Sequence, residues 1–164
     1  MIQARESLRP LYRVMLTLGV VALVILGLGL ATIFRFAPPG QATGLKARIV
    51  GVNPYDPAQH RITGGPSSHF SRDQPFAARV DWSGLPPDVV AGARWYNALD
   101  EPVGGVGPAP ARTLAADSAL VPVMTPAGLH GNLAGQYTLA VLRYSHGQPV
   151  ELLGRAVVLV ERGG

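Results

Sequence analysis

One uncharged run of 21 residues, VMLTLGVVALVILGLGLATIF at positions 14–34, constrains this chain more than any other feature. At about 1.5 Å rise per residue, a helix of this length spans roughly 31 Å, which matches a hydrocarbon core about 30 Å thick. We therefore expect a transmembrane helix over 14–34. A cytoplasmic tail at 1–13 precedes it, and a Pro/Gly-rich linker at 35–45 follows it.

A cleaved signal peptide is the alternative interpretation of this run. Gly29, Leu30 and Ala31 could form a small-residue cleavage site behind a basic N-terminal region. The apolar part of a signal peptide usually has about 7–15 residues, however, and this run is longer. The length favours an uncleaved anchor.

The orientation of the anchor depends on the basic residues at its two ends. Three lie before the run and three follow it closely, so the count is balanced: Arg5, Arg9 and Arg13, then Arg35, Lys46 and Arg48. The N-terminal amine and the closeness of the first three arginines favour an N-terminus inside. We expect a single-pass protein of the cell membrane whose C-terminal domain is periplasmic or extracellular.

Two small residues inside the run, Gly27 and Ala31, are four positions apart. Such a pair lets two helix backbones approach closely, which predicts a face that packs on another transmembrane helix. The alternative is that glycine is simply frequent in membrane helices. The run contains no ionisable residue, so nothing in it could carry protons or ions, or hold a cofactor.

Composition excludes several classes of function for the rest of the chain. The absence of cysteine excludes a disulfide scaffold, a thiolate metal site and a thiol nucleophile. Residues 35–164 carry 11 basic and 9 acidic side chains, and the arginines are scattered singly. A nucleic-acid surface needs clustered basic residues, so we expect no nucleic-acid partner.

Short apolar runs separated by Gly/Pro turns follow the linker. In PFAARVDWS, every second residue from Phe76 to Trp82 is apolar, which is the period of a half-buried strand. We expect strands near 46–52, 75–83, 89–99, 120–124, 135–145 and 149–161, turns at 53–57, 84–88 and 146–149, and a flexible loop at 104–110. Pro122 predicts an edge or bulged strand and Gly154 a bulge. This pattern predicts an all-β sandwich of about seven antiparallel strands over 46–164.

Several of these residues resemble an immunoglobulin-like domain. FAARVDW is similar to the B strand, Trp95 to the core tryptophan of the C strand, and LAGQYTL at 133–139 to the F strand. The resemblance covers roughly residues 70–162. It implies that the ring of Tyr137 hydrogen-bonds to nearby backbone, and that Leu139 and Ala78 or Val80 replace the two cysteines of a disulfide. The expected core anchors are Trp82, Trp95, Tyr137 and Leu139.

Candidate reactive groups do not form a recognisable site. His69, Ser71 and Asp73 share one strand, where neighbouring side chains cannot converge as a catalytic triad. The four histidines are dispersed, and no two have the spacing of a compact metal site: His60, His69, His130 and His146. We therefore expect no enzyme activity, no metal and no cofactor.

Aromatic and basic residues on two strands form the remaining candidate, a protein interface of Arg94, Tyr96, Arg143 and Tyr144. Cross-strand pairing that only stabilises the sheet is the alternative, and we prefer it. The sequence thus predicts a non-catalytic accessory subunit, held in the bilayer and docked on a larger membrane complex. The other hypothesis is a free-standing, membrane-tethered module for surface binding or adhesion, which is a usual role of exported immunoglobulin-like modules in bacteria.

Overall fold

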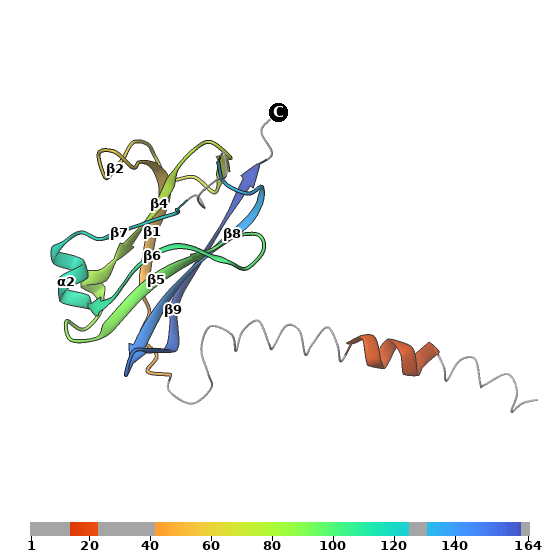
Figure 1. Cartoon of the computed structure of the whole chain (residues 1–164). Coiled ribbons are helices and arrows are strands. Elements are labelled where there is room, and N and C mark those ends of the chain that lie inside the picture. Colours follow the sequence, from red (N-terminus) through yellow and green to blue (C-terminus); the bar gives the residue numbers. More distant parts are fainter. Residues whose placement is uncertain (1–13, 23–41, 125–130, 162–164) are drawn as a thin grey trace, which may run out of the picture. The chain divides into compact units, whose positions relative to one another are not determined.

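The computed structural model describes residues 14–22, 42–124 and 131–161 (Figure 1). The chain separates into two compact units, 1–35 and 36–164, and each is described by itself. The second unit contains every strand of the described residues.

In the first unit, residues 14–22 are helical and their side chains are exposed. Across the ranges that the structure describes, no helix combines the length and apolar character needed to cross a membrane. Most of the predicted 14–34 segment, including Gly27 and Ala31, lies outside the described residues.

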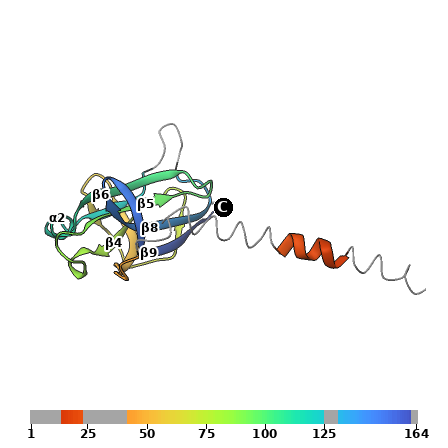
Figure 2. The same ribbon diagram turned by 90° about the horizontal axis from the view of Figure 1, so that it is seen from below.

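The second unit consists mainly of two β-sheets, which confirms the predicted all-β class (Figures 1 and 2). The first sheet is antiparallel, in the order β2 (Arg61–Ile62), β1 (Arg48–Asp56), β4 (Phe76–Asp81) and β7 (Leu120–Pro122). The second has the order β3 (His69–Ser71), β9 (Gln148–Glu161), β8 (Gly135–Ser145), β5 (Val90–Tyr96) and β6 (Pro102–Pro110). Its neighbours are antiparallel except for β3 and β9, which pair in parallel.

Aromatic side chains from both sheets meet in the core. The ring centroid of Phe76 on β4 lies 5.4 Å from that of Trp95 on β5 and 5.7 Å from that of Tyr137 on β8, and both pairs are edge-on. The Phe76 ring also stacks on the Phe70 ring, with 4.5 Å between the two centroids. Edge-on and offset ring pairs add stability beyond the area they bury. Phe76 therefore joins the two sheets at the centre of the domain.

The two tryptophans hold the edge strand β7 and the residue that precedes it. The indole N–H of Trp95 donates to the Val121 carbonyl, and that of Trp82 donates to the Ala119 carbonyl, each at 2.9 Å. β7 has three residues and pairs with only one strand, β4. Pro122 lies in this edge strand, as its sequence predicted, because an edge position does not require its missing N–H.

β1 corrects the turn predicted at 53–57, because the strand continues to Asp56. Pro54 is tolerated there: it pairs with Phe76, and its carbonyl accepts a hydrogen bond from the Thr63 N–H. The chain turns only after Asp56, whose carboxylate accepts hydrogen bonds from two backbone N–H groups of the turn.

β6 corrects the flexible loop predicted at 104–110. The glycines of this segment allow its backbone to lie against β5 more closely than side chains would permit. A Cβ at Gly105 would lie 2.5 Å from the Ala93 carbonyl, and one at Gly107 would lie 2.7 Å from the Ala91 carbonyl. The composition that resembles a loop therefore serves close strand pairing.

Two smaller elements complete the domain. A 3₁₀ turn, η1 (Trp82–Gly84), follows β4 and begins two residues before the turn predicted at 84–88, so the strand predicted at 75–83 ends earlier than expected. A six-residue helix, α2 (Ala111–Ala116), lies at one side of the domain in both views (Figures 1 and 2). It buries Ala111 and Leu114. One and a half turns are too short for a helical period to appear in the sequence, so α2 was not predicted.

Candidate functional site

One face of β8 points away from the core that lies between the sheets. Tyr137, Leu139 and Val141 belong to that core, and the alternate residues therefore lie on the opposite side. These residues, Thr138, Ala140 and Leu142, are buried as well, with exposed fractions of 9%, 1% and 3%, so the exposed side chains of this side belong to the neighbouring strands. We call this side of the five-stranded sheet the outer face. It continues onto β5 and β9 through strand pairing.

The outer face is organised in rows across three strands. In the arginine row, Ala140 on β8 lies between Arg94 on β5 and Arg155 on β9. Both arginines are exposed. The rows on either side are predominantly apolar: Tyr96, Thr138 and Val157 on one side, and Gly92, Leu142 and Leu152 on the other.

Aliphatic side chains of β9 are unusually exposed on this face. Leu152, Val157 and Leu159 have exposed fractions of 36%, 44% and 42%. Val157 and Leu159 are neighbours on this face, as alternate residues of one strand, and Leu152 lies on the other side of Arg155. Exposed aliphatic residues that gather on one face are characteristic of a surface that another molecule covers. The outer face is therefore the strongest candidate for an interaction surface among the described residues.

The structure brings together three of the four predicted interface residues. Arg94, Tyr96 and Tyr144 lie on the outer face, where burial raises the pKa of the Tyr144 phenol and the charge of Arg94 opposes the rise. Arg143 lies on the other side of β8, because successive residues of a strand point to opposite faces. There its guanidinium forms an ion pair with Glu151.

A hollow of about 450 Å³ adjoins the outer face beside Arg94 and Tyr144. Its floor includes Gly105 and Gly107 of β6, and Met124 also lines it. Sequence patterning missed it, since its glycines indicated a loop.

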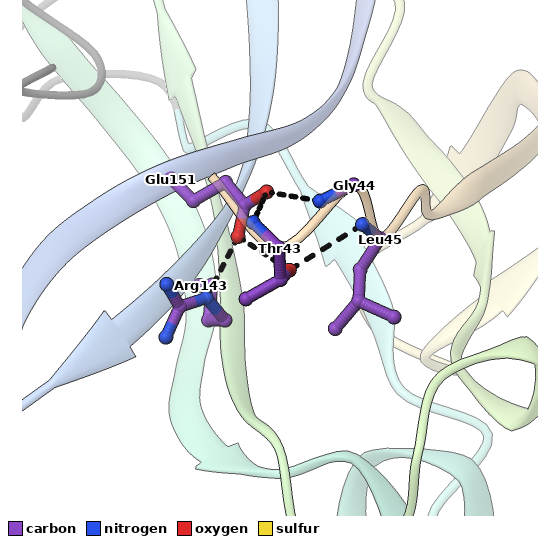
Figure 3. Close-up of polar contacts among 5 residues, drawn as sticks. All are labelled: Thr43, Gly44, Leu45, Arg143 and Glu151. Carbon is purple, nitrogen blue, oxygen red and sulfur yellow. Dashed lines mark hydrogen bonds and ion pairs between the residues drawn. The ribbon is translucent and has the colours of Figure 1, made fainter. Parts of the chain in front are cut away.

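Glu151 forms a polar clamp with the segment that precedes β1 (Figure 3). The N–H and hydroxyl of Thr43 each donate to its carboxylate at 2.7 Å, the Gly44 N–H donates at 3.2 Å, and Arg143 Nε donates at 2.8 Å. Burial raises the pKa of Glu151, but the hydrogen bonds from Arg143 and Thr43 outweigh this and hold the pKa below its ordinary value. The clamp thus fixes the start of the domain to the β8–β9 hairpin.

A wide groove of about 990 Å³ crosses the four-stranded sheet. Arg79 of β4 lines it together with the β1–β2 hairpin on one side and the segment after α2 on the other. Within the hairpin, Tyr55 Oη lies 3.0 Å from His60 Nδ1. His60 and Ser118 both have positive φ angles, 50° and 48°, a backbone conformation that often accompanies functional sites.

The other sequence candidates lie apart from these surfaces or inside the core. Trp82, Trp95, Tyr137 and Leu139 are all buried, with exposed fractions of at most 2%. His69 and Ser71 are exposed on β3, at the edge of the five-stranded sheet. His130 lies outside the described residues.

Neither a metal centre nor a relative adds to this description. In the part of the chain that the structure describes, no three His, Cys, Asp or Glu side chains are grouped closely enough to hold a metal ion. Comparison with known proteins finds no matching family, no matching curated protein and no matching solved structure.

Proposed function

We propose that the β domain is an immunoglobulin-like sandwich. The strand order supports this: β1, β4 and β7 correspond to strands A, B and E, and β5, β8 and β9 to strands C, F and G. The phenol of Tyr137 is hydrogen-bonded to the backbone of Leu133, four residues earlier, as in a tyrosine corner. Trp95 occupies the position of the C-strand tryptophan.

We propose that the chain is a non-catalytic accessory subunit of a membrane protein complex. Residues 14–34 anchor it as a single-pass helix with the N-terminus inside, and Gly27 and Ala31 contact another transmembrane helix. The β domain is exported and docks on a partner subunit. The observation that carries this proposal is the outer face, where exposed aliphatic residues lie beside tyrosine and arginine.

The experiment is native-state mass determination of the full chain, extracted from its own cells in mild detergent. Val157→Lys places a charge in the outer face. Val50→Lys is a matched control, because Val50 is a similarly exposed valine, at 40%, on the four-stranded sheet. The proposal expects a complex with the wild-type chain and with Val50→Lys, and its loss with Val157→Lys.

The same measurement tests the anchor. Gly27→Leu with Ala31→Leu would separate the helix from its neighbour and release the complex while leaving the chain in the membrane. If the wild-type chain has the mass of one copy, with no other polypeptide attached, the accessory-subunit proposal is contradicted.

The groove on the four-stranded sheet favours a second candidate, a membrane-tethered module for surface binding. Its volume is at the upper end of the range for small-ligand sites. Thermal unfolding of the full chain in detergent, with and without added oligosaccharides or peptides, tests this function. A ligand-dependent rise in Tm that Arg79→Ala abolishes would support it, and no rise with any of these compounds would count against it.

A further inference from the structure

We propose that the outer face binds a partner-protein segment whose carboxylate lies over the arginine row, with aliphatic side chains over the two neighbouring rows. This inference rests on the proposed function as an accessory subunit and specifies the chemistry of the partner.

The arginine row is an uncompensated pair of positive charges. Arg94 and Arg155 are two strand spacings apart, about 9.6 Å between their Cα atoms. Among the described residues, the ion pairs form elsewhere, between Arg112 and Asp88 and between Arg143 and Glu151. An external carboxylate would accept hydrogen bonds from guanidinium groups that no carboxylate of the described chain engages.

The neighbouring rows determine what must flank that carboxylate. On β5 and β8, each row is two residues from the next, a distance of about 6.8 Å. On β9, a bulge places Leu152, three residues before Arg155, in the row of Leu142. Exposed Val157 lies in one neighbouring row and exposed Leu152 in the other. Alternate residues of an extended segment have the same spacing, so the partner segment should read aliphatic-x-acidic-x-aliphatic.

The hollow gives the acidic side chain a place to enter. Arg94 and Tyr144 border it, and its volume of about 450 Å³ is ample for one side chain. A purely apolar partner would leave both arginines covered without a counter-charge, which is costly.

A second copy of this chain is a poorer occupant of the face. Two sheets that pack face to face with aligned strands would bring the central rows of the two copies together. Those rows contain Arg94 and Arg155 and no acidic residue, so like charges would meet in a low-dielectric interface. A partner of opposite charge removes that penalty.

Carbodiimide coupling in native membranes tests the inference, because it forms an amide bond only between an amine and a carboxylate in direct contact. Lys46 is the only lysine of the chain, so the background is low. The full chain is prepared as Arg94→Lys, as Arg155→Lys and as the control Arg79→Lys, which lies exposed on the four-stranded sheet. Coupled peptides are then identified by mass spectrometry.

The expected result is coupling at positions 94 and 155 to an Asp or Glu of another polypeptide, within an aliphatic-x-acidic-x-aliphatic segment. The control at 79 should not couple. Arg94→Glu with Arg155→Glu should weaken the complex at least about 30-fold, and reversing the partner's acidic residue to Arg should restore it.

Four results would overturn the inference. Coupling at 79 but not at 94 or 155 would leave the accessory-subunit proposal intact and move the interface to the other sheet. Coupling to a second copy of this chain would show that the outer face binds another copy and not a segment of a different protein. If anionic phosphatidylglycerol vesicles bind the wild-type chain but not Arg94→Glu, and no protein couples, the face contacts lipid instead. A chain that forms no complex at all refutes both proposals.

Discussion

Removal of the Glu151 carboxylate should destabilise the β domain far more than removal of an ordinary surface charge. The carboxylate accepts hydrogen bonds from Thr43 N, Thr43 Oγ1, Gly44 N and Arg143 Nε, all between 2.7 and 3.2 Å. The exposed fractions of the two paired side chains are only 16% for Arg143 and 8% for Glu151. Glu151→Ala would therefore remove the acceptor that Glu151 supplies to a largely buried guanidinium and to two backbone N–H groups.

The magnitude follows from this burial. Breaking a buried ion pair by removing one partner costs about 3–5 kcal/mol, and the partial exposure of Arg143 places the expected loss near the lower limit, about 3 kcal/mol. The matched control is Asp88→Ala, which breaks an ion pair with Arg112 whose side chains are 80% and 66% exposed. Exposed pairs contribute about 1 kcal/mol or less, so the control should change little.

Urea unfolding of the full chain in detergent, followed by the fluorescence of the two buried tryptophans, measures both variants. The account expects Glu151→Ala to lower the free energy of unfolding by about 3 kcal/mol and to lower Tm by 10 °C or more, as about 1 kcal/mol shifts a small domain by several degrees. If Glu151→Ala and Asp88→Ala differ by less than about 1 kcal/mol, the clamp does not stabilise the domain as we infer.

Three further predictions concern the core, β6 and pH. Trp95→Phe should lower the free energy of unfolding by about 1–3 kcal/mol, because it removes the hydrogen bond to the Val121 carbonyl; urea unfolding checks this. Gly105→Ala should detach β6 from β5 and speed amide hydrogen exchange there, whereas unchanged exchange would contradict the close approach. The pKa of Glu151 in the folded state lies below its ordinary value of 4.5. The ionised carboxylate therefore contributes fully to the free energy of unfolding at pH values above the pKa of the unfolded state, and this contribution is lost as the pH falls through the pKa of the folded state. Stability measured below pH 4.5 should thus fall more steeply in the wild type than in Glu151→Gln.

Local pattern was sufficient where an apolar run lies between polar turns. The strand predicted at 135–145 has the bounds of β8, and the strand predicted at 75–83 contains β4. Both strands have paired neighbours on each side, and residues 76–78 and 137–142 are buried on both faces, so the apolar content of each run located the strand more than its alternation did. The all-β class could be predicted for the same reason.

Prediction failed where the stabilising contacts are distant in sequence or involve backbone. Glu151 and Thr43 are 108 residues apart, and nothing near either residue indicates the clamp. One signal was available: in VELL, Glu151 lies two positions before Leu153, which is buried in the core, so it shares the inward side of β9. β6 was missed because glycine is typical of both loops and closely paired strands.

In the predicted interface, a shift of one residue along a strand changes which side chains lie on the same face of the sheet. Arg143 and Tyr144 are adjacent, so both cannot belong to one face of a strand. Strand pairing shows that Tyr144 shares the outer face with Arg94 and Tyr96. Arg155 lies on the same face. Arg155 had no aromatic neighbour in the sequence to distinguish it, so only the sheet reveals the arginine row.

The most direct test of docking through the outer face is hydroxyl-radical footprinting of the full chain in its native membranes and after its purification as a single chain, separated from any partner by a stronger detergent. Val157 and Leu159 report on the outer face, and Val50 reports on the four-stranded sheet; all three are 40–44% exposed in the structure. The account predicts that Val157 and Leu159 are protected in membranes and become reactive after purification, while Val50 reacts equally in both. Equal reactivity of Val157 and Leu159 in the two preparations, with Val50 protected in membranes, would contradict the account.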